Sequence, residues 1–114
     1  MVTSSYTPDR GDVVWLEFTP QAGHEQAGTR PAIVLSPAKY NVKGGMMLCC
    51  PIMNQAKGYP FEVAVVPAGG NVTGVVLADQ VRSLDWRARN AAKFGHVSTQ
   101  CVLDVSAKVK LLLP

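Results

Sequence analysis

Residues 23–36 read Gly-His-Glu-Gln-Ala-Gly-Thr-Arg-Pro-Ala-Ile-Val-Leu-Ser, a polar loop between glycines that runs into an apolar segment. A short run rich in branched aliphatic residues is typical of a buried strand, so 32–36 is predicted to be one. Pro31 favours an extended backbone at Arg30. Arg30 is therefore expected at the start of the strand, where its planar, bidentate guanidinium would suit a phosphate group.

Similar short apolar runs, bounded by Gly, Pro or Asn, recur along the chain. Their length and their bounding turn residues predict a mainly β fold. The predicted strands are 13–18, 32–36, 46–52 and 61–66, followed by a turn at 67–71, an extended run at 73–77 that leads into 79–82, and a capped helical turn at 83–86.

The last segment changes period. Ser98 is a good N-cap residue, and Gln100 and Asp104 would lie on the polar side of the helix that follows it. Apolar residues recur there at three- and four-residue spacing, which predicts a helix with one apolar face. The expected structure is a small, strongly bent sheet closed by a C-terminal helix. The predicted apolar face comprises Val102, Val105, Val109 and Leu112.

The chain has 114 residues, of which 47% are hydrophobic and 17% charged. This length predicts a single domain over 1–114. A domain of this size buries about two-thirds of its unfolded surface. The high apolar content therefore indicates either a well-filled core or an apolar surface that meets a second subunit.

The net charge of +3 is too small to indicate a nucleic-acid binder. Its distribution is more informative, because residues 82–93 contain four basic residues and one acidic residue. Such a segment could follow an RNA backbone, or it could be a solvated face. The basic residues are Arg82, Arg87, Arg89 and Lys93, against Asp85.

Three cysteines, Cys49, Cys50 and Cys101, make an odd count without Cys-x-x-Cys spacing. No signal region or membrane-length apolar run is present, so a reduced, cytoplasmic setting is expected. Neighbouring strand residues face opposite sides, so at most one of Cys49 and Cys50 is expected to face the core. No basic residue flanks either thiol to make it a nucleophile. His24 and His96 are too few and too far apart to indicate a zinc site with these cysteines.

Four motifs, read together, resemble the MazF/Kid (PemK-like) family of toxins from toxin–antitoxin pairs. The resemblance implies an SH3-like β-barrel with a C-terminal helix. It also implies a cytoplasmic endoribonuclease that cuts single-stranded RNA at short sequences without metal or another cofactor. The implied protein is a homodimer silenced by an antitoxin peptide, with no membrane partner and with DNA contacted only through the antitoxin. The motifs are Gly11–Trp15, Gly23-x-Glu25-Gln26-x-Gly28-x-Arg30-Pro31, Lys57-Gly58-Tyr59-Pro60-Phe61-Glu62-Val63 and Leu77-Ala78-Asp79-Gln80-Val81-Arg82-Ser83.

Metal-free cleavage of RNA uses the substrate's own 2′-hydroxyl as the nucleophile, so the enzyme must move protons and stabilise charge at phosphorus. The resemblance implies that Arg30 is the essential arginine, acting as a charge stabiliser, and that Glu25 is the general base. His24 stands where relatives often carry serine. Its ordinary pKa near 6.5 would let it assist proton transfer, but a solvent-exposed loop residue is the favoured interpretation.

One position departs from the family pattern. Where relatives place a threonine that acts with the arginine, this chain has Met53, which has no hydroxyl donor. Asn54 could donate a hydrogen bond, but a neighbouring strand residue is expected to point the other way. Loss of one transition-state hydrogen bond can cost about 10²–10³ in rate. A catalytically weakened protein that still binds antitoxin and RNA is therefore the alternative.

The remaining expectations concern the RNA groove and the aromatic residues. Tyr59 could stack on a base or be a structural aromatic, and Trp15 and Trp86 are interpreted as core residues. A gyrase poison of the CcdB type is a third reading, disfavoured because this chain ends in Leu-Leu-Leu-Pro and not in Trp-Gly-Ile. The substrate-binding residues that the resemblance implies are His24, Gln26, Asn54, Lys57, Tyr59, Gln80, Arg82 and Arg87.

Overall fold

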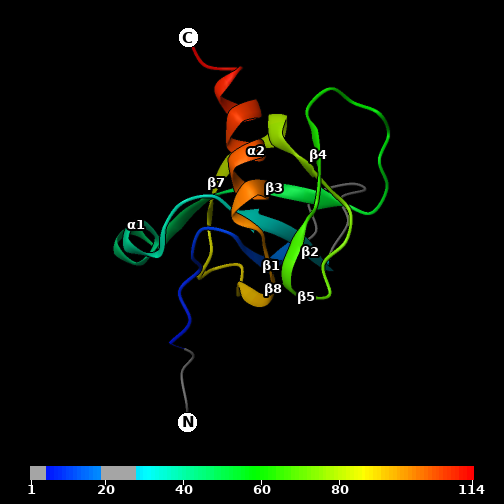
Figure 1. Ribbon diagram of the computed structural model, residues 1–114. Helices are drawn as coiled ribbons and strands as arrows, with labels where there is room; N and C mark the ends of the chain where they lie inside the picture. Colours follow the sequence, from blue (N-terminus) through cyan, green and yellow to red (C-terminus); the bar gives the residue numbers. More distant parts are fainter. Residues whose placement is uncertain (1–4, 19–27) are drawn as a thin grey trace, which may run out of the picture.

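A computed structural model describes residues 5–18 and 28–114 of the chain. These residues form a mainly β structure with two α-helices, as predicted (Figure 1). In chain order the elements are β1 (Asp12–Phe18), β2 (Gly28–Val34), α1 (Ala38–Gly44), β3 (Met46–Met53), β4 (Glu62–Ala64), β5 (Pro67–Gly70), β6 (Val75–Leu77), the 3₁₀ helix η1 (Ala78–Gln80), β7 (Arg82–Asp85), β8 (Ala92–Val97) and α2 (Thr99–Lys110).

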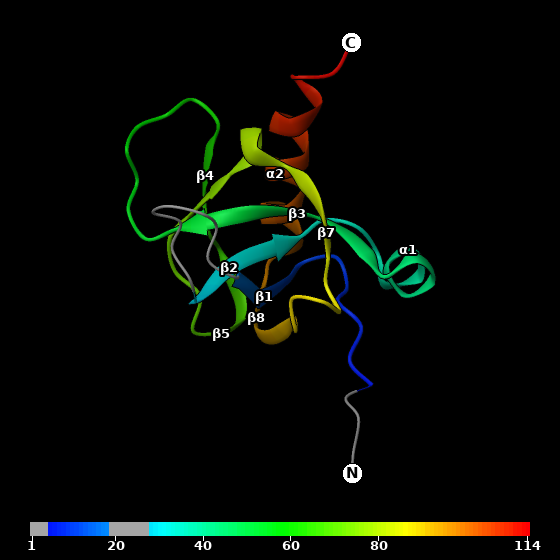
Figure 2. The same cartoon turned by 180° about the vertical axis from the view of Figure 1, so that it is seen from behind.

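The strands pair antiparallel in the order β4-β6-β3-β2-β1-β8-β5. β3 is the centre of this arrangement, because β2 pairs along one of its edges while β7 and then β6 pair along the other. Among the described residues the path ends at β4 and β5 without closing. The sheet is therefore open and strongly bent, not the closed barrel that the resemblance implied, as the two opposite views show (Figures 1 and 2).

Both sides of the bent sheet are covered, so successive strand residues enter two different cores. Cys50 belongs to the core that α2 covers, together with Val105. Cys49 belongs to the second core, with Met47 and Trp86. The prediction that at most one of these cysteines faces the core is therefore wrong. The two side chains do point to opposite sides of the sheet, but each side is covered by a core.

Helix α2 confirms the local prediction. The Ser98 hydroxyl accepts a hydrogen bond from the Cys101 amide at 3.1 Å, which caps the first turn. Val102 and Val105 are buried against the sheet. The helix ends at Lys110, so Leu112 lies beyond it and is 51% exposed, and the apolar face is one turn shorter than predicted.

Two local predictions are wrong because tertiary pairing overrides turn-forming residues. The segment predicted as a turn at 67–71 contains strand β5, which pairs with β8. The segment predicted as a helical turn at 83–86 begins as β7, which pairs with β3. The turn follows it, and the Asp85 carboxylate accepts a hydrogen bond from the Ala88 amide at 2.9 Å.

Helix α1 and strand β8 have no counterpart in the predictions. Helix α1 ends at Gly44 and is followed by Gly45, whose φ of 73° is a left-handed conformation that glycine adopts without strain. Strand β2 begins four residues earlier than predicted, at Gly28, so Arg30 lies inside a strand and not at its start. Strand β4 and the 3₁₀ helix η1 are each only three residues long.

A buried carboxylate joins the N-terminal segment to β8. Asp12 is 3% exposed, and its Oδ2 accepts hydrogen bonds from the Tyr6 hydroxyl at 2.7 Å and from the Asp9 amide at 3.0 Å. Its Oδ1 lies 3.1 Å from His96 Nδ1 and 3.2 Å from Lys93 Nζ. Burial alone would raise the pKa of Asp12, but these hydrogen bonds outweigh it and hold the pKa below its usual value.

Candidate active site

Three arginines from separate segments line one cavity of about 480 Å³, here called the arginine cavity. Arg30 comes from β2, Arg82 from β7 and Arg89 from the turn before β8. The described residues of its lining include no carboxylate, so an anion there would meet only positive charge. The rest of the lining includes Leu16, Phe18, Cys49, Pro51, Met53, Gln80 and Leu84.

Strand pairing explains how the arginines meet. Arg30 lies opposite Leu16 of β1, and Arg82 lies opposite Cys49 of β3. Leu16 and Cys49 both belong to the second core, so the two arginines extend that side of the sheet toward its rim. Arg89 is held by its own contacts. Its guanidinium lies 4.4 Å above the ring centroid of Phe18, and its Nη1 donates to the Glu17 carbonyl at 3.3 Å.

Met53 lies in the wall of the arginine cavity at the end of β3. It pairs with Val75 of β6 and is partly buried. Gly74 packs closely against the backbone of Met53 at this end of the strand. Its φ of 119° is one that side-chain-bearing residues rarely adopt, and a Cβ there would collide with the Met53 carbonyl oxygen. The residue that departs from the family pattern therefore sits beside Arg30, on a closely packed backbone.

A second cavity, of about 500 Å³, meets the first at Arg30 and Met53. It is here called the tryptophan cavity, because Trp15 lines it and is 39% exposed. The interpretation of Trp15 as a core residue is therefore wrong. The interpretation is confirmed for Trp86, which is 6% exposed and donates its indole N–H to the Asn41 carbonyl at 3.0 Å. Besides Arg30, the polar lining of the tryptophan cavity is Thr29, Asn54, Gln55 and Lys57.

Asn54 follows the last residue of β3 and lines the tryptophan cavity but not the arginine cavity. Beyond it the chain bends toward β4, and the Glu62 carboxylate accepts hydrogen bonds from the amides of Lys57 at 2.9 Å and Gly58 at 3.2 Å. The first of these bonds makes the largest contribution to lowering the pKa of Glu62. Tyr59 is 58% exposed and lies outside the lining of these cavities.

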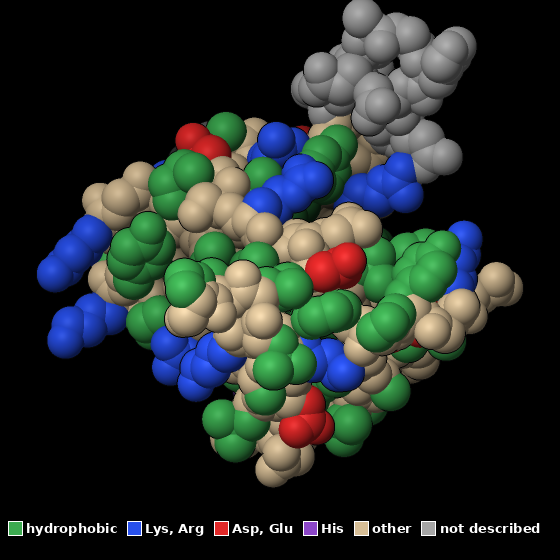
Figure 3. Space-filling view, turned by 90° about the horizontal axis from the view of Figure 1, so that it is seen from above, with side chains coloured by type: hydrophobic (Ala, Val, Ile, Leu, Met, Phe, Trp, Pro, Cys, Tyr) green, Lys and Arg blue, Asp and Glu red, His purple; other side chains and the backbone are tan. Residues whose placement is uncertain are grey.

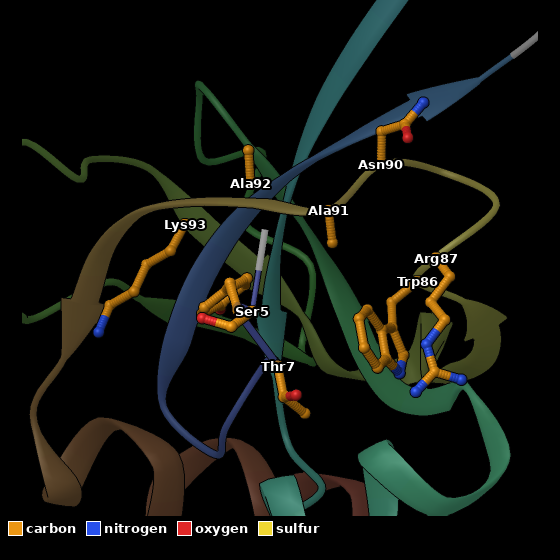
Figure 4. A pocket seen from close by; sticks show the side chains of 9 residues that line it. Ser5, Thr7, Trp86, Arg87, Asn90, Ala91, Ala92 and Lys93 are labelled. Atoms are coloured by element: carbon orange, nitrogen blue, oxygen red, sulfur yellow. The ribbon is translucent and has the colours of Figure 1, made fainter. Parts of the chain in front are cut away.

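The third cavity, of about 1000 Å³, lies between the N-terminal segment and the turn before β8 (Figure 4). Its two cations are engaged within the protein. Arg87 lies 4.6 Å above the Trp86 ring and donates to the Val42 carbonyl at 3.0 Å, whereas Lys93 pairs with Asp12. Arg87 is therefore not brought together with Arg30.

The basic segment 82–93 is consequently divided. Arg82 and Arg89 line the arginine cavity, and Arg87 and Lys93 line the third cavity. A space-filling view from above likewise shows Lys and Arg side chains in several groups separated by apolar surface (Figure 3). The separation of Arg89 from Arg87 has no sequence signal except the turn that carries both, in which Asn90, directly after Arg89, has a φ of 50°.

The loop residues His24, Glu25 and Gln26 lie outside the described residues. The cysteine thiols are poor nucleophiles, since burial raises the pKa of Cys49 to about 11 and that of Cys50 to about 12. Within 5–18 and 28–114, no three His, Cys, Asp or Glu side chains are grouped so as to hold a metal ion. The helices in these ranges are also too short or too polar to span a membrane.

Comparison with known proteins places this chain in a family. Residues 9–113 match the PemK-like, MazF-like toxins of type II toxin–antitoxin systems. The Escherichia coli K12 endoribonuclease toxin MazF is 51% identical over 112 residues, which cover 98% of this chain and 99% of the relative. The E. coli K12 endoribonuclease toxin ChpB is 38% identical over 92% of this chain and 93% of its own.

The crystal structure of a MazE–MazF complex (Form-II) from Deinococcus radiodurans contains a chain that superposes with a TM-score of 0.87. That chain is 55% identical, and the match covers 96% of this chain and 97% of that one. Sequence and structure agree over nearly the same residues. The chain therefore belongs to the PemK-like, MazF-like toxin family of type II toxin–antitoxin systems.

Proposed function

We propose that this protein is an endoribonuclease toxin that cuts single-stranded RNA without a metal ion, by attack of the substrate's 2′-hydroxyl. The observation that carries the proposal is the arginine cavity, where three guanidinium groups surround a space with no carboxylate in its described lining. Arginine binds phosphate bidentately and keeps its charge at physiological pH. A phosphodiester in this cavity would gain negative charge in the transition state, and the arginines would stabilise it.

The proposed reaction has three parts. A base removes the proton of the 2′-hydroxyl, the 2′-oxygen attacks phosphorus, and the bond from phosphorus to the 5′-oxygen breaks as that oxygen gains a proton. The products are a 2′,3′-cyclic phosphate and a 5′-hydroxyl. We assign charge stabilisation to Arg30, because it lies in the cavity wall beside Met53. Glu25 is the proposed base, with His24 beside it in the same loop.

RNA binding is proposed to extend along the cavity wall. Gln80 and Arg82 lie there with Arg30, so they would contact the RNA near the scissile phosphate. Arg89 joins them, although the resemblance did not imply it. Lys57 and Asn54 would contact a neighbouring nucleotide from the tryptophan cavity.

The proposed partners follow the family. A relative's structure is of a MazE–MazF complex, which supports an antitoxin partner for this chain as well. We propose that an acidic, disordered antitoxin segment folds onto the basic surface and blocks RNA sterically. We further propose a cytoplasmic homodimer of single-domain chains that meets DNA only through the antitoxin.

The test is cleavage of a long single-stranded RNA in EDTA, with the product ends mapped chemically. Products that carry a 2′,3′-cyclic phosphate or 3′-phosphate and a 5′-hydroxyl are expected. Arg30→Ala should abolish cleavage, whereas Arg87→Ala is the matched control, because Arg87 lies outside the arginine cavity. Cleavage by the wild type no faster than by Arg30→Ala would overturn the proposal.

A second candidate, a catalytically weakened toxin that still binds RNA and antitoxin, is favoured by Met53. Its thioether offers no hydrogen-bond donor to a phosphate in the arginine cavity. Met53→Thr would then raise the cleavage rate at least tenfold. Met46→Thr is the matched control, since Met46 lies at the other end of the same strand, opposite Asp85. An unchanged rate in Met53→Thr would show that Met53 is not the limiting defect.

A further inference from the structure

Trp15 is an aromatic side chain that the sheet leaves partly uncovered next to the arginine cavity. Its ring stacks on Phe94, with 4.3 Å between the centroids and 17° between the planes. Phe94 lies in the bulge of β8, on one side of β1, whereas Pro31 of β2 lies opposite Trp15 on the other side. Phe94 therefore supports the indole from the β8 side, and the tryptophan cavity lies on the β2 side.

The polar groups around this cavity have the chemistry of nucleotide recognition. Asn54 and Gln55 each bring a carboxamide, which donates and accepts hydrogen bonds as a base edge does. Lys57 brings a positive charge suited to a phosphate. No carboxylate lines the cavity among the residues that the structure describes.

The position of the cavity connects it to the proposed reaction. Arg30 and Met53 line both cavities, so a strand of RNA whose phosphate lies in the arginine cavity passes directly to the tryptophan cavity. The volume of about 500 Å³ is within the range of small-ligand sites. Single-stranded RNA is read mainly by stacking its bases on aromatic side chains and by contacts to their edges.

We infer that the tryptophan cavity binds the base of a nucleotide adjacent to the cleaved phosphodiester, with Trp15 as the stacking platform. This inference rests on the proposed ribonuclease function. Phe94 holds the indole in place, Asn54 and Gln55 contact the base edge, and Lys57 contacts the adjoining phosphate. Trp15 is thus a residue that determines substrate position and base preference.

The experiment begins with the mapped cut site. An oligonucleotide containing that site, with a 2′-deoxy sugar at the cleaved nucleotide, has no nucleophile and stays intact during binding. Each base around the site is then removed in turn by an abasic substitution, and Kd is measured for the wild type and for Trp15→Ala. One abasic position should weaken wild-type binding about tenfold or more, since stacking on an aromatic side chain contributes that much per base.

Trp15→Ala should weaken binding of the intact oligonucleotide by a similar factor and lose nothing further at that abasic position. Such non-additivity identifies the base that contacts Trp15. Trp15→Phe keeps an aromatic ring and should retain most of the affinity, and its thermal unfolding checks the fold. Tyr40→Ala is the matched control, because Tyr40 is 54% exposed on α1 and lies outside the tryptophan cavity.

A second readout uses fluorescence. The chain has two tryptophans, so Trp86→Phe leaves Trp15 as the only one. Its emission should be quenched by the intact oligonucleotide and not by the oligonucleotide that lacks the identified base.

If the protein cuts RNA but every abasic substitution weakens binding equally in the wild type and in Trp15→Ala, the inference is overturned and the ribonuclease proposal stands. Quenching by an acidic antitoxin peptide but not by the oligonucleotide would overturn it in favour of a peptide site, and failure of the wild type both to cut and to bind single-stranded RNA would overturn both.

Discussion

Asp12→Ala tests whether the buried carboxylate is what fastens the N-terminal segment to the sheet. The substitution removes the acceptor for the Tyr6 hydroxyl at 2.7 Å and the Asp9 amide at 3.0 Å. A hydrogen bond to a charged group contributes about 1.5–3 kcal/mol, and both donors here are only partly buried. Lys93 and His96 are 46% and 42% exposed, so water replaces their partner at little cost. Taking the lower value of about 1.5 kcal/mol for each of the two hydrogen bonds, the expected loss in the free energy of unfolding is about 3 kcal/mol.

That loss corresponds to a fall in Tm of about 12 °C, at roughly 4 °C for each kcal/mol in a chain of this size. Thermal unfolding by circular dichroism and urea titration at pH 7 measure it. Asp104→Ala is the control, because its carboxylate accepts an exposed hydrogen bond from Gln100 and should change stability by less than about 0.5 kcal/mol. A loss in Asp12→Ala no larger than in the control would refute the reasoning.

The same variant has a pH signature. The pKa of Asp12 is lowered in the folded protein, so its contribution to stability is complete above the ordinary pKa of 3.8. It is lost as the pH falls through the lowered folded value. The stability difference between the wild type and Asp12→Ala should therefore be constant from pH 7 to about 5 and shrink below about pH 4. A difference that persists at full size in strong acid would contradict the assignment of a charged carboxylate.

Arg89→Ala should reduce the dependence of RNA affinity on salt by about one phosphate contact, whereas Arg87→Ala should leave the slope unchanged; Kd measured over a salt series decides this. The pKa values of Cys49 and Cys50 are about 11 and about 12, against an ordinary 9.0, so less of each thiol is ionised at pH 8. Alkylation should therefore be slower than that of an ordinary cysteine by about 100-fold at Cys49 and about 1000-fold at Cys50. Fast labelling of the folded protein, followed by mass spectrometry, would contradict this. Because the pKa of Glu62 is lowered, the hydrogen bonds that its carboxylate accepts from the Lys57 and Gly58 amides should be at full strength above pH 4.5 and weaken as the pH falls through the lowered value. The chemical shifts of these two amides should therefore titrate in the wild type and not in Glu62→Gln.

The features that the sequence predicts correctly are those whose causes are local. Helix α2 has its cap and its buried face within one segment, so Ser98, Val102 and Val105 identify it without knowledge of the rest of the chain. The mainly β class follows in the same way from short apolar runs. Strand β8 is different, because 92–97 has little pattern of its own and is specified by its pairing with β1.

The candidate site was only partly predictable for the same reason. Arg30 and Arg82 could be identified from motifs, and the structure brings both to one cavity. Arg87 and Arg89 are two residues apart in the sequence but line different cavities, because the turn that carries them directs one toward Val42 and the other toward Glu17. Trp15 was expected in the core, yet β1 extends past the part of the sheet that α2 covers, and Trp15 is partly exposed.

The alternation along β2 limits which changes in chain length this protein can accept. Arg30 lies on the same side of the strand as Ala32 and Val34, which belong to the second core, whereas Ile33 belongs to the core that α2 covers. A one-residue insertion or deletion inside β2 would exchange the sides for every residue that follows, replacing the guanidinium in one cavity with a neighbour and reversing the apolar residues between the two cores. Functional relatives should therefore show no length variation inside β2, between Gly28 and Val34. A deep insertion–deletion scan scored for toxicity would show this as a sharp boundary at the beginning of β2.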